Sequence, residues 1–213
     1  MVKTEQITCP VCGKQHQVKP VTNVKVVCLD MTPQYNMQDI IDAHVLCECG
    51  MLCFNNVHTM PQPHNLVQLP RYQEALSRKC DDVERKFYVM TYGLQYQWAP
   101  IYAVHYYQQI GDVTQQKKWL NIALQRTQEG YDYNTQTAHA SRFACLRSKK
   151  TFFDDSFLYT TQHKLLELYR QLGDFAKADE YCQALLSQCK SSQEQKFLAY
   201  ECKLIAQKDS TIH

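Results

Sequence analysis

The chain has 213 residues, of which 45% are hydrophobic and 21% charged, and its formal net charge is +2. This composition excludes a generally disordered chain, and the sequence has no run of about 20 apolar residues that would span a membrane. The first ten residues are polar and lack the apolar core of a secretory signal, so we expect a cytoplasmic protein with no membrane association.

Two cysteine motifs dominate the N-terminal part of the sequence. Cys9 and Cys12 belong to a Cys-Pro-Val-Cys-Gly motif, and Cys47 and Cys49 belong to a Cys-Glu-Cys-Gly motif. A reducing compartment disfavours a disulfide framework, which leaves metal binding, redox chemistry or packing. Two cysteines on a tight turn can bind one ion, and the glycine after each pair permits the positive φ of such a turn. We therefore predict a structural Zn²⁺ bound by these four cysteines; a metal-free site and a redox-active Cys9–Cys12 pair are the alternatives.

The second motif is one residue shorter than the first, so by register Cys47 lies one residue late. We prefer Cys47 as the fourth ligand and keep Cys53, His44 or a water molecule as alternatives. A zinc ion bound by three cysteines and water would resemble a catalytic site, with His44 or Glu48 as the general base. This open site is our enzymatic alternative.

The charge of the N-terminal part argues against nucleic-acid binding. Residues 1–70 contain four lysines, no arginine and five acidic residues. Binding of DNA or RNA normally needs a basic face, so a nucleic-acid-associated ribbon is only our second alternative. Runs rich in β-branched residues at 18–21 and 24–29 predict short antiparallel strands. We therefore expect a zinc-ribbon domain over residues 1–60.

The rest of the chain is predicted to be helical. Three prolines within residues 61–70 predict a linker, because proline breaks helices. Apolar residues at helical spacing then predict an all-α domain over residues 71–213. The pairs Gly111-Asp112 and Gly173-Asp174 are each expected to end one helix and cap the next, and Gln115 would complete a capping box with Asp112. The predicted fold class is thus α+β, a small zinc ribbon followed by helices.

The second Gly-Asp pair lies in a segment, residues 165–186, that resembles tetratricopeptide (TPR) repeats. Cys182 and Cys189 share the apolar face of the second helix there, which favours packing over catalysis. Helix pairs of this kind stack and expose a concave face that binds peptides or partner proteins. An irregular stretch over residues 129–155 separates this pair from the preceding helices.

Two groups of residues are candidates for binding such a partner. Tyr102, Tyr106 and Tyr107 lie in a tyrosine-rich helical segment, and Arg142 and Arg147 belong to a small basic cluster. The functional interpretations are an aromatic-lined groove and a site for an acidic peptide. The structural interpretations are packing within a helical array and a solvated helix end.

The order of a CPxCG motif, a second Cys-Gly motif and TPR-like helices resembles an uncharacterised bacterial family, a domain of unknown function that joins a zinc ribbon to a helical repeat region. The resemblance covers roughly residues 7–190 and is carried by residues 9–13, 119–124 and 165–186. Members of that family usually have Cys-x-x-Cys-Gly in both motifs, from which residues 47–50 depart. The N-terminal part alone also resembles the CpXC ribbon family.

Neither resemblance implies a reaction, and the sequence contains no Gly-rich phosphate loop, H-E-x-x-H motif or G-x-S-x-G motif. The only cofactor implied is structural Zn²⁺. We therefore predict a non-enzymatic interaction protein, in which zinc folds the ribbon and the TPR-like helices bind a protein or peptide partner.

Overall fold

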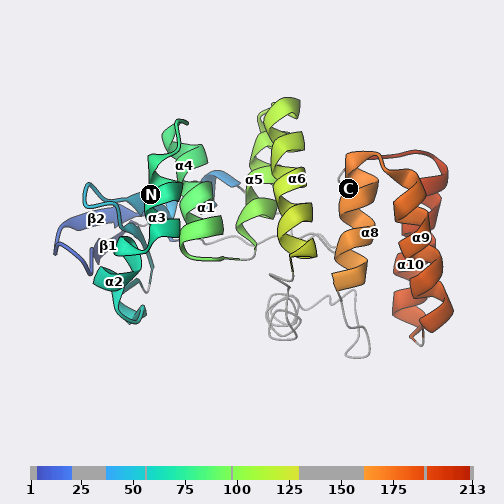
Figure 1. Cartoon of the computed structure of the whole chain (residues 1–213), viewed down its shortest axis with the longest axis horizontal. Coiled ribbons are helices and arrows are strands. Elements are labelled where there is room, and N and C mark those ends of the chain that lie inside the picture. Colours follow the sequence, from blue (N-terminus) through green and yellow to red (C-terminus); the bar gives the residue numbers. More distant parts are fainter. Residues whose placement is uncertain are drawn as a thin grey trace. The chain divides into compact units, whose positions relative to one another are not determined.

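The computed structural model describes residues 4–20, 37–55, 57–96, 98–129, 161–189 and 191–211. These residues form two compact units: the first contains the described residues up to Gln116, and the second contains those from Lys117 onward. Two short antiparallel strand pairs, with one short helix between them along the chain, come before the remaining helices, and this order confirms the predicted α+β fold class (Figure 1). None of the helices in this part of the chain combines the length and the apolar character that a membrane span needs.

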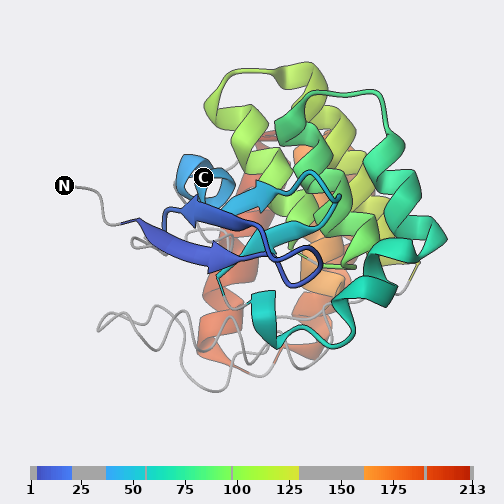
Figure 2. The ribbon, with the colours of Figure 1, turned by 90° about the vertical axis from the view of Figure 1, so that its left-hand side faces the viewer.

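Four short strands make two antiparallel pairs in the first unit (blue and cyan in Figure 2). β1 (Glu5–Thr8) pairs with β2 (Gln15–Val18), and β3 (His44–Leu46) pairs with β4 (Leu52–Phe54). We call residues 5–18 the first hairpin and residues 44–54 the second hairpin. The turn of each hairpin carries one of the two cysteine motifs.

The strands flank the cysteine motifs more closely than the sequence predicts. Among the described residues 18–20 of the first predicted strand, only Val18 lies in a strand, at the end of β2. Val21 and the predicted strand at 24–29 lie outside the described residues. β2 has the sequence Gln-His-Gln-Val, with a single β-branched residue. Strand propensity therefore does not identify it, and the hairpin is recognised by its turn instead.

The proline-rich segment contains helices where the sequence predicts a linker. η1 (Val57–Thr59) is followed by α2 (Pro63–Gln68) and α3 (Pro70–Ser77). Pro63 and Pro70 each stand at the first position of a helix, where the missing N–H needs no partner and the fixed φ suits the helix. The prolines therefore begin two helices here, and the first unit continues through this segment.

Helices α1, α4 and α5 complete the first unit. α1 (Met37–Asp42) and α4 (Asp82–Tyr88) both pack against α5 (Ala99–Gln109). α4 runs directly into η2 (Val89–Gly93), a π-helical turn that packs against α3. The core of this unit is formed by buried side chains from these elements, among them Met37, Tyr72, Phe87, Met90, Ala103 and Tyr107.

The predicted turn at Gly111-Asp112 ends α5. Gly111 has a φ of +77°, and the Asp112 N–H donates to the Tyr107 carbonyl at 2.9 Å, which satisfies a carbonyl at the helix C-terminus. Asp112 then caps α6 (Val113–Gln128) by accepting a hydrogen bond from the Gln115 N–H at 3.0 Å. Both predicted functions of the pair are therefore confirmed. The predicted capping box is not closed, because the Asp112 N–H already bonds to Tyr107.

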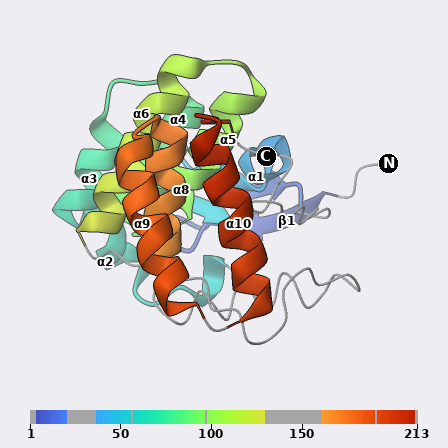
Figure 3. The same cartoon turned by 90° about the vertical axis from the view of Figure 1, so that its right-hand side faces the viewer.

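In the described part of the second unit, three helices follow α6 (orange to red in Figure 3). α8 (Thr161–Leu172) and α9 (Phe175–Gln188) meet at the second Gly-Asp pair, where Gly173 has a φ of +82° and Asp174 accepts a hydrogen bond from the Lys177 N–H at 3.3 Å. α10 (Ser192–Ala206) packs against α9. The core of this unit consists of Leu165, Leu166, Tyr169, Ala178, Cys182, Leu185, Phe197, Leu198 and Ile205.

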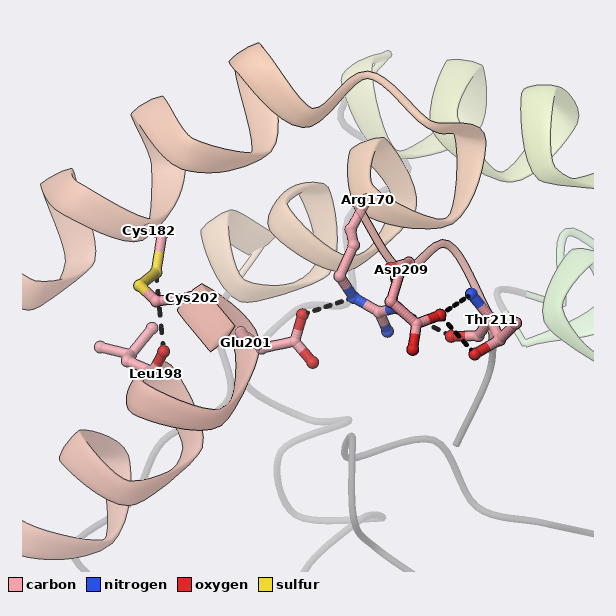
Figure 4. Close-up of polar contacts among 7 residues, drawn as sticks. All are labelled: Arg170, Cys182, Leu198, Glu201, Cys202, Asp209 and Thr211. Atoms are coloured by element: carbon pink, nitrogen blue, oxygen red, sulfur yellow. Dashed lines mark hydrogen bonds and ion pairs between the residues drawn. A yellow bond between two sulfur atoms is a disulfide. The ribbon is translucent and has the colours of Figure 1, made fainter. Parts of the chain in front are cut away.

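One disulfide joins the last two helices (Figure 4). Cys182 on α9 lies in the core, as predicted, and Cys189 is partly buried beside it. Cys182 also bonds to Cys202 on α10, which the sequence does not predict. Disulfides are rare in the reducing compartment expected for this chain, so this bond departs from the expectation.

A buried ion pair ties α8 to α10 and to the C-terminal segment (Figure 4). Arg170 Nε donates to Glu201 Oε2 at 2.7 Å, and neither side chain is exposed. Arg170 Nη1 also donates to the carbonyls of Asp209 at 3.1 Å and Thr211 at 2.7 Å. Buried charges are tolerated when they are paired and hydrogen-bonded in this way. The arginine thus connects three segments of the second unit.

Candidate metal centre

The turns of the two hairpins bring four cysteine sulfur atoms together. Cys9 Sγ lies 3.6 Å from Cys49 Sγ, and Cys12 Sγ lies 3.5 Å from Cys47 Sγ. All four sulfur atoms lie within 4.8 Å of one another, and no other cluster of cysteine, histidine or carboxylate ligand atoms within the described ranges has this arrangement. We call these four residues the cysteine tetrad.

The distances within the cysteine tetrad fit a tetrahedral metal ion. Zinc bound by four thiolates at about 2.3 Å has neighbouring sulfur atoms about 3.8 Å apart. A disulfide needs about 2.05 Å, and the four cysteines are free thiols here. Cys9 and Cys47 are buried, whereas Cys12 and Cys49 are exposed. The tetrad therefore has the geometry of a four-ligand metal site with one side in the protein and the other at the surface.

The shorter second motif reaches this geometry through a tighter turn. In the first hairpin the Gly13 N–H donates to the Cys9 carbonyl, four positions earlier, at 2.9 Å. In the second hairpin the Gly50 N–H donates to the Cys47 carbonyl, three positions earlier, at 2.8 Å. The missing residue is thus lost from within the turn, and Cys47 takes the place that Cys9 has in the first hairpin. This placement agrees with the choice of Cys47 over the other fourth ligands.

Both turns end in a glycine with left-handed backbone, as predicted. The φ values are +76° at Gly13 and +87° at Gly50, a region that glycine enters without strain. The surroundings differ, because a Cβ at Gly50 would lie 2.9 Å from Leu76 Cδ1, whereas a Cβ at Gly13 would meet no described atom within 4 Å. The second hairpin is therefore packed closely against α3, and the first turn is open at the equivalent point.

The thiols of Cys9, Cys47 and Cys49 differ in how readily they ionise. Burial opposes ionisation of Cys9, but backbone hydrogen bonds from Cys12 and Val11 outweigh it and lower its pKa to about 7. Burial raises the pKa of Cys47, and it raises the pKa of Cys49 to about 12, with the Cys9 thiol adding to the effect. One thiolate therefore forms easily and opposes the others. A divalent cation would remove this opposition, since it favours the thiolate at every ligand.

An exposed ion pair joins the turns beside the cysteine tetrad. Lys14 Nζ lies 2.5 Å from Glu48 Oε1, and this hydrogen bond raises the pKa of Lys14. Both side chains are largely exposed, so the pair contributes little stability by itself. Glu48 is a candidate general base in the sequence-based enzymatic alternative, whereas Lys14 is not among the predicted site residues. Opposite charges on the two cysteine turns are the signal that would have found the pair.

The alternative fourth ligands lie outside the cysteine tetrad. His44 Nδ1 is 2.6 Å from the Ile40 carbonyl oxygen, and the His44 ring packs against Phe54. Burial lowers the pKa of His44, which favours the neutral ring. The buried Cys53 thiol donates to the Met51 carbonyl at 3.7 Å, and burial raises its pKa. Both groups are thus engaged with backbone carbonyls.

Only some of the predicted partner-binding residues are among the described residues. Tyr102 and Tyr107 are buried, with 7% and 4% exposure, and Tyr106 is half-buried. The rings of Tyr106 and Tyr107 pack against each other with centroids 5.1 Å apart. These contacts agree with the structural interpretation, packing within a helical array. Arg142 and Arg147 lie outside the described residues.

Comparisons of this chain with protein-family models, with curated protein sequences and with solved structures find no match in any of the three. The case for a metal centre therefore rests on the geometry of the cysteine tetrad itself.

Proposed function

We propose that this chain is a non-enzymatic zinc-binding interaction protein, in which one structural Zn²⁺ bound by the cysteine tetrad joins the two hairpins. The observation that carries the proposal is the convergence of four sulfur atoms within 4.8 Å. Tetrahedral sites made of thiolates select zinc over hard divalent cations such as magnesium and calcium. Because the hairpins come from separate parts of the chain, a bound ion would cross-link them and stabilise the first unit.

Four sulfur ligands favour a structural role over a catalytic one. A catalytic zinc keeps one position for water or substrate, whereas a structural zinc is closed by four protein ligands. The enzymatic alternative needs one cysteine to stand away from the other three. The Cys12–Cys47 distance of 3.5 Å weighs against this for the most doubtful ligand, Cys47.

The interaction part of the proposal rests on the helices. α8 and α9 pack as a pair joined by a Gly-Asp turn, and α10 packs against α9. Stacked helix pairs in TPR-like proteins present surfaces to peptides and proteins. The proposed resemblance to the bacterial family that joins a zinc ribbon to a helical region rests on the same order, two cysteine motifs followed by helices. We therefore propose a protein or peptide partner for the helices.

The zinc content of the full chain tests the metal centre. Elemental mass spectrometry of protein purified without a histidine tag should find one zinc per chain, and Cys9→Ser and Cys47→Ser should each lose it. Cys80→Ser is the matched control. Cys80 is a partly buried cysteine of the first unit that lies outside the cysteine tetrad, and its sulfur donates to the Arg78 carbonyl, so this variant should keep its zinc.

Two results would contradict the proposal. A wild-type chain without zinc would rule out the metal centre. Zinc retained in Cys47→Ser would point to Cys53, His44 or water as the fourth ligand and favour the enzymatic alternative.

A binding experiment tests the proposed partner. The zinc-loaded chain should capture a protein or peptide, and that partner, once purified, should bind the chain again. Binding of RNA or DNA at low salt, with no protein partner, would favour the nucleic-acid alternative.

A further inference from the structure

A tyrosine of α3 is hydrogen-bonded to the second hairpin directly beside the cysteine tetrad. Tyr72 is fully buried. Its hydroxyl accepts a hydrogen bond from the Leu52 N–H at 2.9 Å and donates one to the Gly50 carbonyl at 3.2 Å. Both backbone groups belong to the segment that follows Cys49. A single side chain from a helix thus satisfies a donor and an acceptor of this segment.

The carbonyl that Tyr72 contacts belongs to the same peptide group as an N–H that hydrogen-bonds a cysteine of the tetrad. The Gly50 carbonyl and the Met51 N–H belong to one planar peptide unit. The backbone of Met51 hydrogen-bonds the Cys49 thiol. Because the unit is rigid, the Tyr72 hydroxyl fixes the direction in which the Met51 N–H points. A continuous path therefore runs from the tyrosine through one peptide group to a sulfur of the cysteine tetrad.

The Tyr72 ring is itself fixed by the π-helical turn. A Cβ at Gly93 would lie 2.7 Å from Tyr72 Cδ2, so the backbone of η2 lies directly against the ring. The φ of Gly93 is not positive, so glycine is needed there for the close approach. Leu76, one helical turn after Tyr72, lies close to Gly50. Two side chains of α3 therefore contact the second hairpin, and the backbone of η2 packs against the Tyr72 ring.

We propose that Tyr72 is a positioning residue of the metal centre, which orients Cys49 for zinc and couples the centre to the packing of α3 on η2. This inference rests on the proposed function. Removing a group that orients metal ligands typically weakens metal binding by about 10- to 100-fold. Loss of the hydroxyl leaves all four thiols in the chain but frees the second turn, so zinc should leave faster.

The test compares zinc release from loaded full-length variants. Tyr72→Phe removes the hydroxyl and keeps the ring, and its zinc should pass to a chromophoric chelator about 10-fold faster than from the wild type. The measurement is made at a temperature where circular dichroism shows native helix content. Tyr88→Phe is the control, because Tyr88 is also buried in the first unit and its ring contacts Arg78 and Tyr92. It should release zinc at the wild-type rate.

A cobalt spectrum supplies a readout that a general loss of stability would not move. With Co²⁺ in place of zinc, Tyr72→Phe should shift the d–d and sulfur-to-cobalt bands, whereas Tyr88→Phe should match the wild type. Gly93→Ala keeps the hydroxyl but places a methyl group 2.7 Å from the Tyr72 ring, so it should change release and spectrum in the same direction. If Tyr72→Phe does not fold, Gly93→Ala alone tests the role of Tyr72.

Wild-type release rates and cobalt spectra in both Tyr72→Phe and Gly93→Ala would overturn the role of Tyr72. The proposed function would survive that outcome, because it depends on zinc in the wild-type chain. A wild-type chain that binds neither zinc nor Co²⁺ would instead overturn the proposed function and this inference together.

Discussion

Gly13 and Gly50 follow equivalent cysteines but have different surroundings, and this difference can be measured. Both have left-handed φ, so alanine at either position costs about 1–2 kcal/mol in backbone conformation. Alanine at Gly50 would also press on Leu76, whereas alanine at Gly13 meets open space. We expect Gly50→Ala to lower the melting temperature and zinc affinity more than Gly13→Ala does. Equal effects of the two variants in thermal unfolding and zinc competition would contradict the packing of the second hairpin on α3.

The buried His163 makes the stability of the second unit depend on pH. Burial lowers its pKa to about 4, although the Glu194 carboxylate, 3.2 Å away, opposes the shift. In the unfolded chain the pKa is about 6.5, so between about pH 6.5 and 4 only the unfolded state takes up this proton. The free energy of unfolding should therefore fall as the pH drops through this window, by about 3 kcal/mol in total.

Urea unfolding at pH 7 and pH 4.5 checks this dependence. His163→Gln should flatten the difference between the two pH values, and the exposed His64→Gln should leave it as in the wild type. Loss of zinc in acid affects all three proteins alike, so the comparison isolates His163. A pH dependence that His163→Gln leaves unchanged would show that the buried imidazole is not its source.

The sequence identifies the four cysteines of the tetrad but does not identify the residues that hold their turns in place. Both cysteine motifs are local patterns, so the four cysteines that converge can be predicted from their spacing. The place of Cys47 could not be fixed by register, because register assumes equal turns and the second turn is shorter by one residue. Tyr72 and Lys14 could not be assigned either, since their contacts join segments far apart in the sequence.

Among the elements, the Cys182–Cys202 disulfide is the covalent link between α9 and α10. It closes a loop across a separation of 20 residues, which by loop-closure entropy stabilises the folded state by about 3 kcal/mol. Cys202→Ser should lower the free energy of unfolding by about that amount. Cys189→Ser, which alters a free and partly buried thiol nearby, is the control. An equal loss in both variants would show that packing, and not the disulfide, is responsible.

The ends of helices could be predicted from the sequence where local capping interactions determine them. The Gly-Asp pairs end α5 and α8 because glycine accepts positive φ and aspartate caps the next helix. The sequence predicts that the prolines at 61–70 interrupt helices, but Pro63 and Pro70 stand at the first positions of α2 and α3. The disulfide was beyond local analysis, because it depends on how α9 packs against α10.

The division into two units predicts which amides lose protection from hydrogen exchange when the metal is removed. Both hairpins, α3 and η2 belong to the first unit, whereas α8 to α10 belong to the second. Removal of zinc by a chelator should therefore speed hydrogen exchange at the amides of residues 5–18, 44–54 and 70–93. The amides of residues 161–206 should keep their protection. Exchange that rises equally in both ranges would contradict a metal centre confined to the first unit.

The predicted division at residues 61–70 is not where the described structure divides. Cysteine spacing and the onset of helical periodicity suggest a ribbon and a helical domain, but the first unit includes both hairpins and the helices up to Gln116. Contacts such as those of Tyr72 and Leu76 with the second hairpin join the two parts. Only tertiary packing reveals them, so a boundary drawn from composition falls inside the unit.

Zinc K-edge X-ray absorption on the wild-type chain is the decisive test of a closed four-sulfur site, because it counts the atoms bound to the metal. The cysteine tetrad predicts four sulfur atoms at about 2.3 Å and no nitrogen or oxygen in the first coordination shell. Three sulfur atoms with one nitrogen or oxygen atom would contradict the closed site and restore the open, catalytic alternative.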